Sequence, residues 1–259
     1  GFLLGMVFLI QILSGVLLST CYNPEISYAY NRVQHILREL WSGWCFRYMH
    51  ATGASFVFIL TYLHILRGLN YSYSYLPLSW ITGLILFLIS IVTAFMVYVL
   101  PWGQMSFWGA TVITNLLYFI PGIVSWICGG YLVSDPTLKR FFVLHFTFPF
   151  IALCIVFIHI FFLHLQGSTN PLGGDTALKI PFYPNLLSLG INGFKMVLVL
   201  FFSQSLFGIL PLSHPDNAIT VDRYATPLHI VPEWYFLPFY AMLKTIPKKT
   251  AGLLVMLAP

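Results

Sequence analysis

The sequence predicts an all-α fold, a polytopic bundle of transmembrane helices. Only 7% of its 259 residues are charged, whereas about a quarter of residues are charged in soluble domains. Residues 68–134 and 141–174 contain no Lys, Arg, Asp or Glu, and a membrane-spanning helix needs about 20 predominantly apolar residues. A soluble hydrophobic core is the alternative, and uncharged stretches of this length disfavour it.

Apolar runs bounded by turn signals place the membrane spans. The predicted spans cover residues 1–20, 44–69, 78–100, 136–166 and 187–212. A Pro-Trp-Gly break ends the third span, and a Pro-rich loop follows the fifth. Tyr and Trp residues near the ends of the spans are typical anchors at the membrane surface.

Three shorter helices are predicted outside the spans. Residues 24–41 show apolar positions at i, i+3, i+4, i+7 and i+8, the pattern of a helix lying on the membrane surface or capping the bundle. These positions are Val33, Ile36, Leu37, Leu40 and Trp41, with Arg32, Arg38 and Glu39 on the other side. A second amphipathic stripe, over residues 104–117, consists of Met105, Trp108, Val112 and Leu116. A third short helix starts near Glu233 and ends before Pro247.

Two pairs of histidines, each fourteen residues apart, indicate the chemistry. They are His50 with His64, and His145 with His159. Fourteen residues is close to four helical turns, so each pair lies on one face of its helix, roughly 21 Å apart along the axis. Two such helices packed together form two opposed couples, and each couple can ligate one haem iron from both sides.

A histidine in a membrane helix can instead serve only as a hydrogen-bond partner of a neighbour. Four at matched spacing favour a functional role, because ionisable groups inside a membrane are costly. Iron with two imidazole ligands has no open position, which suits electron transfer. Gly1, Gly15 and Gly83 would let backbone approach a flat macrocycle. Arg47 and Arg67 would neutralise haem propionates, or else extend from helix ends toward the lipid headgroups.

Other features narrow the class of protein. The net charge of +5 is spread over helix ends without a basic run, which argues against a nucleic-acid partner. The cysteines lack C-x-x-C spacing and are interpreted as free small apolar residues. The chain begins without Met inside one apolar run and stops inside another that starts at Ala251. We therefore expect a fragment of a longer membrane protein.

Four long strings resemble the cytochrome b family, the haem subunits of ubiquinol–cytochrome c oxidoreductases (respiratory complex III). They are RYMHATGAS at 47–55, VYVLPWGQMSFWGATVITN at 97–115, RFFVLHF at 140–146 and VPEWYFLPFYAMLKTIP at 231–247. The mitochondrial branch matches better than the photosynthetic one, because one chain carries both the fourth span and the Pro-Glu-Trp-Tyr motif. The resemblance implies a di-haem four-helix domain over residues 1–170 and a truncated second domain over 171–259.

The resemblance also implies the ligands of two non-covalent b haems. His50 and His145 match the ligands of the P-side, low-potential haem. His64 and His159 match those of the N-side, high-potential haem. The family carries Gly where this chain has Val97, and this departure adds bulk facing the first haem.

The resemblance places a quinol-oxidation pocket between the third span and the Pro-Glu-Trp-Tyr loop. Glu233 is expected to take a proton from the quinol, with its pKa raised by apolar and aromatic neighbours, and Tyr235 is the second catalytic residue. The alternative for Glu233 is an acid that stabilises a helix N-terminus, and both roles are compatible. The remaining pocket residues are Phe95, Tyr98, Met105, Trp108, Gly109, Val112, Ile113, Pro232, Trp234 and Tyr240.

A quinone-reduction pocket is expected near the second haem. His164 and Ser168 match family residues that bind the quinone carbonyls, and Asn170 lies close to them in the sequence. A structural role of His164 at its helix end is the alternative. The family usually carries an acid where this chain has Gly190, so another group or water must supply the proton, or turnover there is impaired.

The expected function is that of a redox enzyme subunit. It would oxidise ubiquinol at one membrane face, carry electrons through two haems, reduce ubiquinone at the other face and contribute to the proton gradient. The implied partners are an iron–sulfur protein, cytochrome c1-type subunits, a second copy of the complex and the lipid of the mitochondrial inner membrane.

Two other functions explain part of the sequence. A transporter whose histidines relay protons would show no haem absorbance. A transmembrane ferric reductase shares paired histidines, but the Pro-Glu-Trp-Tyr loop and the lack of a Gly-rich dinucleotide motif argue against it.

Overall fold

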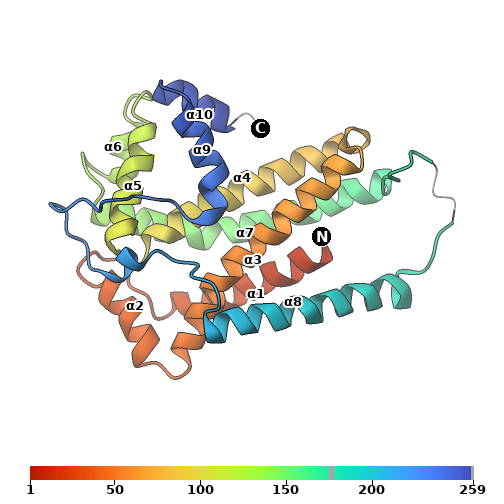
Figure 1. The fold of residues 1–259 in the computed structure, drawn as a ribbon, viewed down its shortest axis with the longest axis horizontal. Coiled ribbons are helices and arrows are strands. Elements are labelled where there is room, and N and C mark those ends of the chain that lie inside the picture. The colour runs from red at the N-terminus through yellow and green to blue at the C-terminus, as the bar shows by residue number, and fades with distance from the viewer. Residues whose placement is uncertain (175–177, 258–259) are drawn as a thin grey trace. The chain divides into compact units, whose positions relative to one another are not determined.

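The chain folds into helices joined by turns and loops in a computed structural model that describes residues 1–174 and 178–257 (Figure 1). Within these residues no β-strand forms, and the single extended pairing is an isolated bridge between Gly103 and Thr220. The all-α prediction is confirmed.

In the part of the chain that the structure describes, five helical segments are long and apolar enough to cross a membrane. They are α1 (Phe2–Ser19), α3 (Gly43–Asn70), α4 (Pro77–Val99), α7 (Asp135–Gln166) and Phe182–Phe207, which joins the turn η2 (Phe182–Leu186) to α8 (Leu187–Phe207). Their mean hydropathy lies between 1.4 and 2.5, and at most 22% of each apolar window is buried within the protein. The unburied apolar sides suit contact with lipid. The predicted spans are confirmed, each within a few residues at its ends, except that the last ends at Phe207 and not at Leu212.

Among the described residues, five shorter helices lie outside the spans. They are α2 (Ala29–Arg38), α5 (Gln104–Leu116), α6 (Ile123–Cys128), α9 (Leu237–Thr245) and α10 (Lys249–Leu257). Helix α6 was not predicted from the sequence, and its ends are set by Gly122 and Gly129 with φ of 76° and 71°. Three 3-10 turns complete the order: η1 (Tyr73–Tyr75), η3 (Pro215–Ala218) and η4 (Trp234–Phe236).

The predicted surface helix is shorter than expected. α2 ends at Arg38, so Leu40 and Trp41 lie beyond it. Ile36 is buried, whereas Trp41 is 92% exposed. Trp41 therefore does not belong to the buried stripe, and it suits an anchor among lipid headgroups.

Two compact units share the chain, and some helices contribute residues to both. The first contains Gly1–Leu18, Ser42–Val92 and Thr147–Leu210. In it α3 packs along α8 (Figure 1), and Phe56 meets Phe201 edge to face at 5.6 Å. The Gln11 amide lies directly against Gly53, where any Cβ would collide with it. The small residue Gly53 thus lets α1 approach α3 closely, as small residues do in membrane helices, where water supplies no hydrophobic driving force.

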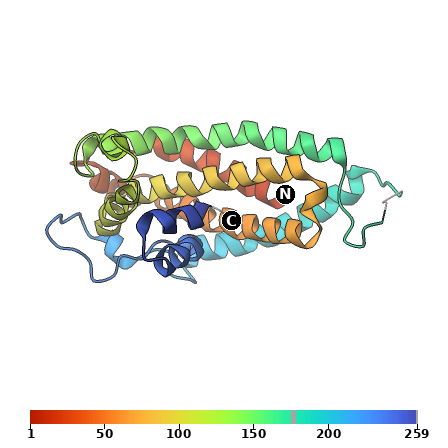
Figure 2. The ribbon, with the colours of Figure 1, turned by 90° about the horizontal axis from the view of Figure 1, so that it is seen from above.

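The second unit contains Ser19–Trp41, Thr93–Phe146 and Pro211–Pro259. Hydrogen bonds to loops hold it together, from Tyr22 Oη to the Leu100 carbonyl and from Tyr30 Oη to the Ala218 carbonyl, both 2.6 Å. Asp135 accepts a bond from Ile26 N at 3.0 Å. Figure 2 shows α7 as one continuous helix, although its residues are divided between the two units. The predicted boundary near residue 170 stays a prediction.

Candidate functional site

His64 on α3 and His159 on α7 face each other within the first unit. Their ring centroids are 6.2 Å apart and their planes differ by 66°. Imidazoles that bind one metal ion from opposite sides have centroids about 6 Å apart, because each metal–nitrogen bond is about 2 Å and each nitrogen lies about 1 Å from its ring centre. The couple therefore has the spacing of two axial ligands.

Glycines lie against three of the predicted histidine ligands. A Cβ on Gly15 would lie 2.9 Å from His50 Cε1, and one on Gly83 would lie 3.2 Å from His159 Cε1. The contact at Gly1 is less close, because a Cβ there would lie 3.6 Å from His64 Cε1. The sequence suggested that these glycines leave room for a macrocycle, and the structure shows that they also leave room for the imidazole rings.

We predict that Gly15→Ala disturbs binding of the haem for which His50 is a predicted ligand. The new methyl would lie closer to Cε1 than van der Waals contact allows, so a ring fixed by iron must tilt or leave. The matched control is Gly5→Ala on the same helix, where nothing lies within 4 Å of the added atom. Haem content per chain and the low-spin spectrum of each haem are the measurements. Identical spectra for the two variants would contradict the predicted role of Gly15.

The donor set fits haem iron better than a bare metal ion. Within residues 1–174 and 178–257, no three His, Cys, Asp or Glu side chains gather around a common point. Two imidazoles leave the other ligand positions of the iron to a porphyrin. Ser79, one turn from Thr82 on α4, has a buried Oγ without a hydrogen-bond partner in the described structure, as expected where a polar group of a cofactor binds.

Each predicted ligand has a contact at its other ring nitrogen. Nδ1 of His50 lies 2.9 Å from Ser14 Oγ, and Nδ1 of His159 lies 3.0 Å from Thr82 Oγ1. Nδ1 of His145 lies 3.0 Å from the Thr93 carbonyl, and Nδ1 of His64 lies 3.3 Å from an Arg67 nitrogen. Neither Ser14 nor Thr82 was predicted from the sequence to contact a ligand. Their signal was a hydroxyl residue directly before Gly15 and before Gly83.

Other haem assignments stay predictions. His50 belongs to the first unit and His145 to the second, so each is described by itself. The contact of Arg67 is with an imidazole, which leaves its predicted propionate role untested, as is that of Arg47. Val97, in the second unit, is half-buried.

Glu233, Tyr235 and Tyr98 come together in the second unit. Tyr235 is 5% exposed. Burial raises the pKa of its phenol, and the Glu233 carboxylate and the Tyr98 phenol raise that pKa further. Tyr235 therefore stays a neutral hydrogen-bond donor beside an acid, the arrangement expected where a proton is handed over.

Of the other predicted wall residues in the same unit, Met105 is buried, whereas Tyr98, Trp108 and Gly109 are half-buried. Met105 is fully buried, and Gly109 lies against Tyr98, with its hypothetical Cβ 3.6 Å from Cε1. Tyr98 Oη and Trp108 Nε1 are buried without hydrogen-bond partners among the described residues, as expected where a polar ligand binds. Val112, another predicted wall residue, is not buried, because its side chain is 42% exposed. Phe95 packs against Phe141 at 5.5 Å.

The Pro-Glu-Trp-Tyr side of the predicted pocket has fewer described contacts. Trp234 meets Tyr235 edge to face at 5.5 Å, and the Lys244 ammonium lies 5.5 Å from the ring of Tyr240. Pro232 is half-buried, as is Ile113 on α5. The described contacts therefore give Tyr235 the best-defined place on this side.

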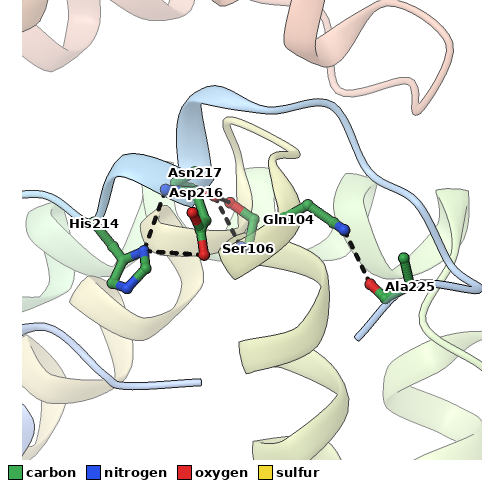
Figure 3. A network of polar contacts seen from close by, with 6 residues as sticks. All are labelled: Gln104, Ser106, His214, Asp216, Asn217 and Ala225. Atoms are coloured by element: carbon green, nitrogen blue, oxygen red, sulfur yellow. Dashed lines mark hydrogen bonds and ion pairs between the residues drawn. The ribbon is translucent and has the colours of Figure 1, made fainter. Parts of the chain in front are cut away.

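A polar network fixes the start of α5, which carries this wall (Figure 3). Asn217 Oδ1 accepts from Ser106 N at 2.9 Å, and Ser106 Oγ lies 2.6 Å from the Tyr98 carbonyl. Gln104 donates to the Ala225 carbonyl at 3.0 Å. A Cβ on Gly103 would lie 2.3 Å from the Asn217 carbonyl, so only glycine allows this approach. Ser106 and Asn217 are far apart along the chain, and no role was predicted for them from the sequence.

The predicted quinone-reduction residues are not brought together by the described contacts. His164 and Ser168 are exposed. Asn170 Oδ1 accepts from Leu172 N at 3.0 Å, which gives its side chain a place in a turn. At Gly190 an added Cβ would lie 2.9 Å from the ring of Phe2. This pocket stays a prediction.

A cavity of about 260 Å³ opens elsewhere in the second unit. None of the predicted site residues lines it. Its walls are Thr20, Cys21, Tyr22, Asn23, Arg32, His35 and Leu40.

The fold and the site define a class: a multi-pass helical membrane protein in which histidines of neighbouring apolar helices face each other. Family models match residues 1–167 as "Cytochrome b/b6/petB" and residues 220–259 as "Cytochrome b(C-terminal)/b6/petD". The chain belongs to the cytochrome b family.

Curated relatives and a solved structure agree with this family. Cytochrome b of Plasmodium vivax is 78% identical over 258 residues, which cover 100% of this chain and 68% of the relative. Cytochrome b of Toxoplasma gondii is 58% identical over 259 residues, which cover 100% of this chain and 70% of the relative. A chain of a hyperthermophilic respiratory complex III superposes with a TM-score of 0.92 at 35% identity, covering 100% of this chain and 71% of that one.

Proposed function

We propose that this chain works as the cytochrome b subunit of a quinol–cytochrome c reductase complex. It oxidises quinol at one membrane face, passes electrons across the membrane and reduces quinone at the other face. The observation that carries the proposal is the opposed couple of His64 and His159, 6.2 Å apart, on two apolar spans of a cytochrome b chain.

Two b haems are proposed as the cofactors. His64 and His159 would hold one, and His50 and His145 the other. When bound, haem would supply a one-electron redox centre at each couple of histidines. Because the histidines in each helix are fourteen residues apart, the two centres lie at two depths, roughly 21 Å apart along the helices. Arg47 and Arg67 are proposed to neutralise the propionates.

At the proposed quinol-oxidation site, residues of this chain accept the proton and orient the substrate. Glu233 accepts it from the quinol hydroxyl, and neutral Tyr235 donates a hydrogen bond that orients the substrate. Tyr98 Oη and Trp108 Nε1, both buried and without protein partners among the described residues, offer two further polar contacts. The apolar and aromatic wall excludes water, which limits loss of the proton to the solvent.

The other proposals extend the family assignment. Ubiquinone and ubiquinol are the proposed substrates, and the mitochondrial inner membrane is the proposed location. An iron–sulfur protein is proposed to accept one electron of each quinol, and cytochrome c1-type subunits to complete a dimeric complex.

Absorbance of the purified complex tests the function against a transporter. A reduced-minus-oxidised spectrum with two b-type components, together with quinol-dependent reduction of cytochrome c, is expected. A complex without haem bands would exclude electron transfer and favour a proton-relaying transporter.

We further predict that Gly190→Asp speeds quinone reduction. A carboxylic acid there would supply the proton that developing negative charge on the quinone requires. Its Cβ displaces the ring of Phe2, which is 39% exposed and free to turn outward. His164→Ala should slow the same step about tenfold, through loss of a charge-assisted hydrogen bond. The measurement is oxidation of the haem of His64 and His159 by quinone after rapid mixing, with quinol oxidation inhibited.

Gly190→Ala is the control, because it displaces Phe2 without adding an acid. Equal rates for Gly190→Asp and Gly190→Ala would show that another group already supplies the proton. If His164→Ala also has the normal rate, the quinone-reduction site is wrongly placed.

A further inference from the structure

Two hydroxyl–glycine pairs meet two of the predicted iron ligands in the same way. Ser14–Gly15 on α1 meets His50, and Thr82–Gly83 on α4 meets His159. In each pair the glycine faces Cε1 of the ring: a hypothetical Cβ would lie 2.9 Å from it at Gly15 and 3.2 Å from it at Gly83. The preceding hydroxyl lies at Nδ1, 2.9 Å away for Ser14 and 3.0 Å away for Thr82. The repetition on two helices indicates a common device.

Each hydroxyl can only accept a hydrogen bond from its imidazole. A hydroxyl has a single proton to donate. Ser14 Oγ donates it to the Ile10 carbonyl at 2.7 Å, and Thr82 Oγ1 donates it to the Leu78 carbonyl at 2.8 Å, as residues back-bonded within a helix do. The lone pair that remains toward the histidine can accept from Nδ1–H, and for His159 the Ser79 carbonyl is a second acceptor beside Thr82.

The protonation of the ring follows from this bond. A neutral imidazole carries one proton, so a proton fixed on Nδ1 leaves the lone pair on Nε2. Nε2 is then ready to bind iron. A hydrogen bond donated from the other ring nitrogen also makes a ligand histidine more basic, and a more basic ligand favours the oxidised iron.

We propose that Ser14 and Thr82 are positioning residues that hold His50 and His159 in the iron-binding tautomer and lower the midpoint potentials of their haems. The proposal rests on haem binding by these histidines. Ser14 is 4% exposed, so water does not readily replace its hydroxyl. Gly15 and Gly83 set the ring plane while the hydroxyl sets its rotation.

Redox titration of the intact complex tests the proposal. Ser14→Ala should raise the midpoint potential of the haem of His50 only, and Thr82→Val that of the haem of His159 only. A tenfold change in the ratio of oxidised to reduced haem corresponds to about 59 mV for one electron. Thr82→Ser keeps the hydroxyl and should restore the original potential.

The controls are hydroxyls that back-bond within a helix without touching a described histidine. Ser205→Ala is matched to Ser14 in burial, because Ser205 is 7% exposed and donates to the Phe201 carbonyl at 2.8 Å. Ser90→Ala lies on α4, where Ser90 donates to the Leu86 carbonyl at 2.8 Å. Neither should move a potential.

The outcomes separate this proposal from the proposed function. Two bound haems with unchanged potentials in Ser14→Ala and Thr82→Val would overturn the positioning role and leave the function standing. If Thr82→Val loses its haem, retention of haem and potential in Thr82→Ser supports the proposal, and loss in both variants overturns it. Absence of haem from the unmodified complex would overturn the function itself.

Discussion

His64→Ala and His159→Ala are each expected to remove the same haem from the complex and to stop electron transfer to quinone. The two rings stand at the spacing of axial ligands, and loss of either one leaves a position of the iron open and the cofactor weakly held. Since the two residues are proposed to serve one centre, the double variant should lose no more haem than either single variant. His50→Ala and His145→Ala are expected to remove the other haem and to abolish quinol oxidation.

The measurement is the haem content per chain together with redox difference spectra of the assembled complex. His35→Ala, on the exposed side of α2, serves as the control and should keep both haem signals. Two intact signals in any of the four ligand variants would contradict the assignment of that ligand. Loss of different haems from His64→Ala and His159→Ala would contradict their pairing.

Glu233→Gln is expected to slow quinol oxidation by about a hundredfold while both haems stay bound. General acid–base catalysis contributes at least this much, and glutamine keeps the shape of the side chain but cannot take the proton. The alternative role, an acid that caps a helix, has less support. Glu233 precedes the turn η4 (Trp234–Phe236), and its side chain makes no capping hydrogen bond to it.

Steady-state reduction of cytochrome c by quinol, with the haem spectrum recorded on the same sample, checks this prediction. Glu39→Gln is the matched control, because Glu39 is an exposed carboxylate at the end of α2. A normal rate and pH profile in Glu233→Gln would reduce Glu233 to a structural acid. A changed haem spectrum would mean that the substitution disturbs more than the proton transfer.

The sequence by itself determined the membrane spans and the positions of the paired histidines within them. Both depend on local properties. An apolar run of sufficient length must become a helix in lipid, because its backbone polar groups have no other partners there. Histidines fourteen residues apart must then share a helix face. The long strings that resemble cytochrome b identified the family, which the matched family models confirm.

Only the tertiary structure decided which groups meet across helices. The register between two helices depends on how their side chains pack, so the periodicity of each helix alone does not predict that register. The facing of His64 and His159 and the contact of Ser14 with His50 are of this kind. The hydrogen bond from Ser106 N to Asn217 Oδ1 joins residues 111 positions apart, so no local sequence pattern could predict it. For the same reason the sequence could note Gly190 as a missing acid but could not show that Phe2 fills the space beside it.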